Sequence, residues 1–169
     1  MHANELLDQI GKKPLPPVLL FAPGAAPFGK EPWEPALAER AIERIIATHV
    51  DPGMRDLCLS SFHADECKPG EIVMEAQTLP FLVERRVLIV RSASRYNAMS
   101  GEKGSPLAPL IAYLEAPSDT TLLILIADNV DKRKKFYKAC QKGGAIVECP
   151  QLDDRALTTW IRSEVQNRG

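Results

Sequence analysis

The chain alternates between short apolar runs and segments in which apolar residues recur every three or four positions. Runs of the first kind are typical of strands buried on both faces of a sheet, and segments of the second kind are typical of amphipathic helices. Five runs predict strands, at residues 18–22, 57–62, 87–90, 121–127 and 145–148.

Helical periodicity fills most of the gaps between these runs. The clearest case is 37–46, where apolar positions face one way and charged positions the other. Further helices are expected around 72–76, 107–114 and 136–140, the last capped by Asp131 and ended by Gly143 and Gly144. Strands that alternate with helices imply right-handed crossovers, so the pattern predicts an α/β fold with a five-stranded, mostly parallel, doubly wound sheet.

One apolar segment fits neither kind of element. Leu79, Phe81 and Leu82 surround Pro80, which prevents a regular helix through them, and they stand too close to the strand at 87–90 to form another strand. We call Leu79, Phe81 and Leu82 the apolar tip, because we expect them at a helix end on the edge of the sheet. There they are either tucked under the domain or offered to a partner protein.

Composition places the chain among globular proteins of ordinary size. Its 169 residues are 45% hydrophobic and 25% charged, which fits one self-sufficient domain. The net charge of -1 lacks the broad positive field that non-specific nucleic-acid binding requires. The longest aliphatic run, 122–127, is too short to span a bilayer, and residues 2–13 lack the apolar stretch of a secretion signal. We therefore expect a cytoplasmic protein with no membrane contact.

The four cysteines contain no CxxC pair. Cys58, Cys67, Cys140 and Cys149 lie in or beside apolar segments, which predicts reduced thiols used as small core residues. A metal site would have to recruit Cys58, His63 and Cys67, whose spacing matches no common zinc pattern. We expect no metal.

A stretch after the first predicted strand has the spacing of a phosphate-binding loop. Gly24, Gly29 and Lys30 fit GxxxxGK in the segment GAAPFGK. However, Glu31 stands where a Ser or Thr hydroxyl would meet magnesium, and Pro27 removes one backbone donor. The sequence thus favours a degenerate phosphate loop with no bound cofactor, and leaves a nucleotide-binding P-loop NTPase as the alternative function.

Two further features weaken the NTPase interpretation. Pro35 belongs in the first turn of a helix, so the helix is expected to start near Glu34, away from the lysine of the loop. Arg91 and Ser92 follow the third predicted strand, where an ATPase carries acidic residues for metal and water.

Three blocks together carry a family resemblance: AQTLPFLVERRVLIVR (76–91), LIAYLEAPSDTTLLILIADNVDKRKKFYKAC (110–140) and GGAIVECPQLDDRALTTWI (143–161). As a set, the blocks resemble the N-terminal domain of the delta subunit of bacterial DNA polymerase III, a clamp-loader subunit. The match runs from about residue 18 to the end of the chain. The resemblance implies an AAA+-like (P-loop NTPase-like) domain that does not hydrolyse ATP itself and works within the polymerase holoenzyme, whose overall activity is DNA-directed DNA synthesis.

The resemblance also implies partners and a site. The family member binds the ring-shaped beta sliding clamp and helps to open it during DNA replication, and its clamp-binding position falls on Phe81 and Leu82 with Leu79 beside them. Its other contacts, to the remaining loader subunits, belong to further domains that are mostly absent here, and any DNA contact is indirect or weak. Residues 1–150 are then the clamp-binding domain, and 151–169 are the first helix of a following, truncated helical domain.

Two segments keep open interpretations. The proline-rich stretch 23–35 is longer than the turn expected of the family, and its Trp33 is interpreted as a local packing anchor, with a contact site as the alternative. The second segment is a basic run, which we interpret as a solvated helix face with contact to DNA or a loader subunit as the alternative. Its members are Lys132, Arg133, Lys134, Lys135, Lys138 and Lys142.

Overall fold

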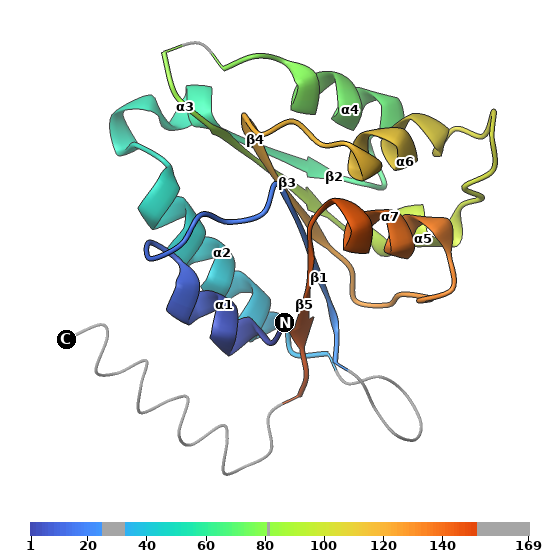
Figure 1. The fold of residues 1–169 in the computed structure, drawn as a ribbon, viewed down its shortest axis with the longest axis horizontal. Helices are drawn as coiled ribbons and strands as arrows, with labels where there is room; N and C mark the ends of the chain where they lie inside the picture. The colour runs from blue at the N-terminus through green and yellow to red at the C-terminus, as the bar shows by residue number, and fades with distance from the viewer. Residues whose placement is uncertain (25–32, 81, 152–169) are drawn as a thin grey trace.

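The computed structural model describes residues 1–24, 33–80 and 82–151 (Figure 1). Its elements, in chain order, are α1 (Ala3–Gln9), β1 (Val18–Pro23), α2 (Pro35–His49), the 3-10 turn η1 (Pro52–Met54), α3 (Arg55–Cys58), β2 (Leu59–His63), α4 (Pro69–Gln77), β3 (Arg86–Arg91), α5 (Ser94–Ala98), α6 (Ala108–Glu115), β4 (Thr121–Ile126), α7 (Lys135–Gly143) and β5 (Ala145–Cys149). The expected helix at 151–169 falls almost wholly outside these ranges.

The five strands form one sheet in the order β2-β3-β4-β1-β5, and every neighbouring pair is parallel. Helices α1 and α2 cover one face, while α4, α6 and α7 cover the other (Figure 1). The predicted doubly wound α/β fold is therefore confirmed, with a sheet that is wholly rather than mostly parallel. Because the strands are parallel, all of them begin at one edge of the molecule, which we call the amino edge, and end at the opposite carboxyl edge.

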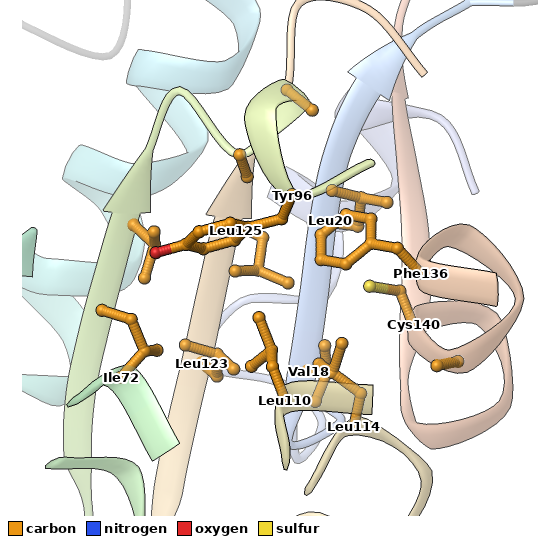
Figure 2. Packing of buried hydrophobic residues seen from close by; sticks show 14 of the residues in the cluster. Val18, Leu20, Ile72, Tyr96, Leu110, Leu114, Leu123, Leu125, Phe136 and Cys140 are labelled. Atoms are coloured by element: carbon orange, nitrogen blue, oxygen red, sulfur yellow. The ribbon is translucent and has the colours of Figure 1, made fainter. Parts of the chain in front are cut away.

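Two apolar layers hold the sheet between the helices. Successive residues of a strand point to opposite faces, so Leu19 packs in the layer under α1 and α2 while Leu20 packs in the other layer. In that second layer Tyr96 meets Phe136 edge to face, with ring centroids 6.3 Å apart (Figure 2). Each such fully buried side chain contributes about 1.5 to 3 kcal/mol by leaving water.

Helix α2 begins as its sequence predicts. Glu34 is the N-cap, its Oε1 accepts a hydrogen bond from the Ala36 N–H, and Pro35 occupies the first turn. This geometry satisfies a backbone donor that would otherwise lack a partner.

The start of β2 differs from the prediction. The strand begins at Leu59, because residues 55–58 form the short helix α3, and Leu57 is exposed instead of lying in the sheet. Helices α1 and α5 were not predicted either, since each is too short to show a full apolar period.

The predicted cap of α7 is wrong. Lys134 is the N-cap and makes no side-chain capping bond, whereas Asp131 Oδ1 accepts the N–H of Arg133 in the turn before the helix. The helix does end at Gly143 and Gly144, as expected. None of the helices in the described part of the chain has the length and apolar character needed to cross a membrane.

Candidate protein-binding site

The apolar tip lies between the end of α4 and the start of β3, at the amino edge of the sheet. Leu79 is 77% exposed and Leu82 is 67% exposed, although both are large apolar side chains. Phe81, the third residue of the tip, lies outside the described residues. The sequence left open whether the tip is tucked under the domain or exposed to a partner, and Leu79 and Leu82 are exposed.

The end of α4 explains why the chain leaves the helix at this point. The N–H of Thr78 donates to the carbonyls of Met74 and Glu75, at 3.1 and 3.2 Å, and the Thr78 hydroxyl also donates to Met74. Thr78 then takes an extended conformation, and Pro80 prevents the helix from resuming. Leu79 is consequently carried away from the domain.

The residues between the tip and β3 are held to the rest of the domain. Val83 packs against the layer under α1 and α2, and Arg85 Nη1 donates to the Leu15 carbonyl at 3.2 Å. Burial lowers the pKa of Arg85, because desolvation disfavours its charged form. The segment is thus fixed to the domain on both sides of its exposed leucines.

Leu82 has a left-handed backbone with φ of 67°. A branched, non-glycine residue rarely adopts this region, because its Cβ crowds the backbone. The turn directs the Leu82 side chain into solvent instead of toward the core. Backbone strain held at an exposed apolar residue is the kind of feature that clusters at binding sites.

Sequence reasoning missed three neighbouring apolar residues. Met74 on α4 is 73% exposed, and Met54 and Leu57 are exposed just before β2. Because β2 and β3 are parallel neighbours, the segment before β2 and the apolar tip reach the same amino edge. Met74 could have been found from the sequence, because the periodicity of α4 places this apolar residue on the polar face of the helix. Leu57 could not, because it was assigned to a strand.

A hollow lies at the carboxyl edge, at the opposite end of the strands from the tip. It is a cavity of about 490 Å³ between the start of α2 and the ends of β2, β3 and β4. Trp33 lines it and also packs on the layer under α2, as a packing anchor would.

The two arginines that line this cavity are each paired with a carboxylate. Arg91 donates to Glu39 through both terminal guanidinium nitrogens, with Nη2 2.9 Å from Oε2, and this interaction lowers the pKa of Glu39. Arg95 pairs with Asp65 at 3.2 Å. Each arginine therefore already has a carboxylate, which leaves little positive charge for a phosphate.

The phosphate-loop residues are only partly described. Gly24 is buried at the end of β1, and a Cβ there would lie 2.5 Å from the Pro150 Cβ. Gly29 and Lys30 lie outside the described residues. At the end of β3, where a hydrolytic site would need acid, the structure has the Arg91 pair and Ser92 with φ of 58°.

The cysteines are free thiols, three buried and Cys67 partly so. Burial raises the pKa of the Cys149 thiol to about 12, so that thiol stays protonated. Within the ranges that the structure describes, no group of three or more His, Cys, Asp or Glu side chains could hold a metal ion.

The basic run is mostly exposed and partly paired. Arg133 binds Asp131, Lys135 Nζ lies 3.0 Å from Glu102, and Lys142 Nζ lies 3.6 Å from Glu115. Phe136, between these cations, is buried. Lys135, Lys138 and Lys142 are thus exposed residues of α7, whereas Arg133 precedes the helix, and the role of the run stays a prediction.

Comparison with known proteins supplies the context for these sites. Residues 28–150 match the family model described as DNA polymerase III, delta subunit. DNA polymerase III subunit delta of Bacillus subtilis is 30% identical over an alignment of 138 residues, and the match covers 78% of this chain and 38% of the relative. The chain thus spans little more than a third of that curated relative.

Two solved structures are similar to this chain. A Bacillus subtilis DNA clamp loader delta protein superposes with a TM-score of 0.77 at 25% identity, over 98% of this chain and 48% of the other. A DNA polymerase III gamma subunit-related protein of Thermotoga maritima gives a TM-score of 0.52 at 12% identity, over 92% and 47%, and shows similarity of fold alone.

Proposed function

The chain belongs to the DNA polymerase III delta subunit family, and from that premise we propose that it binds the beta sliding clamp through the apolar tip. In this role it is a non-catalytic clamp-loader domain that helps to open the ring during DNA replication in the cytoplasm. Other loader subunits would be contacted by parts of the protein beyond this domain.

The observation that carries the proposal is the exposure of Leu79 and Leu82 on a tethered segment. Scattered exposed leucines need no explanation, but two on one strained, proline-interrupted turn form a compact apolar projection. Burying each in a groove of a partner contributes roughly 1.5 to 3 kcal/mol before the costs of association. Anchors of this kind usually dominate an interface.

Ring opening needs no bond-making chemistry in this scheme. A domain that binds the open form of a ring interface more tightly than the closed form shifts the equilibrium by its difference in affinity. The apolar tip supplies binding energy, and ATP would be hydrolysed by other subunits of the loader. Arg91 supports this division, because a cation already bonded to Glu39 stands at the end of β3, where hydrolysis requires acidic side chains for metal and water.

The proposal is tested by measuring the affinity of the 169-residue chain for a purified beta clamp. Leu79→Ala and Leu82→Ala should each weaken binding about tenfold, since each removes one buried anchor, while circular dichroism stays unchanged. Phe81→Ala belongs in the same series. Leu57→Ala, at an exposed leucine outside the tip, is the control and should change affinity less than about threefold.

Full affinity in the combined Leu79→Ala and Leu82→Ala variant would refute the proposal. An equal loss in Leu57→Ala would show that apolar area at the amino edge, and not the tip, is recognised. Magnesium-dependent ATP turnover that disappears in Lys30→Ala would instead establish the phosphate loop as a working site.

A further inference from the structure

Arg86, the first residue of β3, is bonded to the last turns of α4. Its guanidinium binds the Glu75 carboxylate, and Nη1 also lies 3.4 Å from the Glu75 carbonyl. Ser60 of β2 joins the pair: its hydroxyl donates to Glu75 Oε1 at 3.1 Å and lies 3.3 Å from Arg86 Nη2. Three elements meet in this network.

A buried threonine fixes the next carbonyl. The Thr121 hydroxyl of β4 donates to the Ala76 carbonyl at 2.9 Å. With Thr78 on the Met74 carbonyl, three consecutive carbonyls at the end of α4 have donors. Carbonyls at a helix end lack partners inside the helix, so these bonds hold the end of α4 against the sheet.

The position of the pair in the chain matters more than its strength. Glu75 stands four residues before Leu79, and Arg86 stands four residues after Leu82. Their contact therefore closes the intervening segment into a loop that carries the apolar tip. Holding a loop in its bound shape before binding removes part of the ordering cost that association would otherwise impose.

We propose that the Glu75–Arg86 pair, supported by Ser60, is a positioning device that pre-orders the apolar tip for its partner. The inference rests on the proposed clamp-binding function and adds residues that need not touch the clamp. With side chains only 14% exposed for Arg86 and 29% for Glu75, the pair is shielded from water and from competing ions.

The same strand supplies a matched control. Arg91, at the other end of β3, pairs with Glu39, and this pair is also partly exposed, at 36% and 44%. Replacing either arginine by methionine keeps the aliphatic stem and removes the charged donors. Each variant loses one ion pair, and Arg86→Met should lose more stability because its pair is less exposed, but only Arg86→Met frees the loop that carries the tip.

The test compares Arg86→Met with Arg91→Met for clamp affinity and for hydrogen exchange of the amides in 78–85. Arg86→Met should weaken binding about tenfold, through faster dissociation and slower productive docking, and should speed exchange in that segment. Glu75→Gln, which keeps an acceptor oxygen, should have a smaller effect in the same direction. Arg91→Met should leave both measurements unchanged.

A double-mutant cycle separates positioning from general destabilisation. If Arg86 acts through the tip, Arg86→Met should cost less affinity in a Leu82→Ala background than in the original chain. Additive losses, or equal behaviour of the Arg86 and Arg91 variants, would overturn the inference while leaving the tip as the binding site. Should Arg86→Met not fold, Glu75→Gln carries the same comparison.

A different result would contradict the proposed function itself: the combined Leu79→Ala and Leu82→Ala variant would keep full affinity for the clamp. Exchange in 78–85 is measured on the chain without a clamp, so it tests the tether by itself. Exchange that Arg86→Met and Glu75→Gln leave unchanged would overturn the positioning role whatever the clamp data show.

Discussion

Leu82 combines two costs that a purely structural residue would avoid. Its apolar side chain remains in water, and its backbone stays in a left-handed conformation that costs about 1 to 2 kcal/mol for residues with a Cβ. Selection for stability alone would favour glycine there. The residue is better explained by what its side chain does in a complex.

Leu82→Gly should accordingly separate stability from binding. Removing the strain outweighs the added freedom of the unfolded chain, so the free energy of unfolding should stay level or rise by up to about 1 kcal/mol in urea titrations. Clamp affinity should nevertheless fall about tenfold.

The control is Leu79→Gly, at an exposed residue without a positive φ. There glycine only adds freedom to the unfolded chain, so stability should drop by about 0.5 to 1 kcal/mol. A marked loss of stability in Leu82→Gly, similar to that in Leu79→Gly, would show that the left-handed turn carries no strain.

Some of these residue-scale features could be read from the sequence and others could not. The N-cap at Glu34 follows from local chemistry, because Pro35 fixes the first turn of α2. The Glu75–Arg86–Ser60 network could not be anticipated, since it depends on how two strands and a helix end come together in space. Phe81 remains a prediction, because it lies outside the described residues.

At the scale of elements, the tight junction between α7 and β5 shows how the sequence controls packing. A Cβ on Gly143 would lie 1.7 Å from the Leu114 carbonyl oxygen, and one on Gly144 would lie 2.0 Å from that of Val18. Both neighbours are backbone atoms that cannot rotate away. The two glycines therefore let α7 and β5 approach α6 and β1.

Gly143→Ala should lower the free energy of unfolding by about 2 to 3 kcal/mol, because the backbone of α6 or α7 must shift. Gly70→Ala in α4 is the opposite case, with nothing within 4 Å of the added Cβ, and should stabilise the helix by about 0.5 to 1 kcal/mol. Chemical denaturation of both variants checks the pair. A tolerated Gly143→Ala would mean that the junction relaxes without cost.

Elements with a full hydrophobic period were predictable, and short ones were not. Strands β1, β3, β4 and β5 and helix α2 follow directly from apolar patterning. The capping box of α1 gave no clear signal in the sequence, because its N-cap is His2 and not the Ser, Thr, Asp or Asn that usually marks a helix start. Leu57 and Cys58, the last two residues of α3, were assigned to the strand because they are apolar and directly precede β2.

At the scale of the whole molecule, ion pairs tie the helical layers to the sheet. The Arg91 bond lowers the pKa of Glu39 on α2, so Glu39 binds its proton less readily in the folded state than in the unfolded chain. Its contribution to stability is full above the ordinary carboxyl pKa of 4.5 and is lost as pH falls through the lower, folded value.

The unfolding free energy should therefore fall more steeply below about pH 4.5 in the original chain than in Glu39→Gln. The difference should be modest, about 0.5 kcal/mol, because the pair is partly exposed and screened. Urea titrations across the acid range measure it. Parallel curves for the two chains would show that the pair adds nothing to acid sensitivity.

The apolar tip at the amino edge and the cavity at the carboxyl edge are separated by the length of the strands. Six residues of β3 lie between Arg86 and Arg91 inclusive, a span of roughly 20 Å at 3.3 Å per residue. A partner bound at one edge of the sheet therefore leaves the opposite edge accessible to a second partner. A rigid domain that is bound at both edges can transmit mechanical force from one partner to the other without deforming.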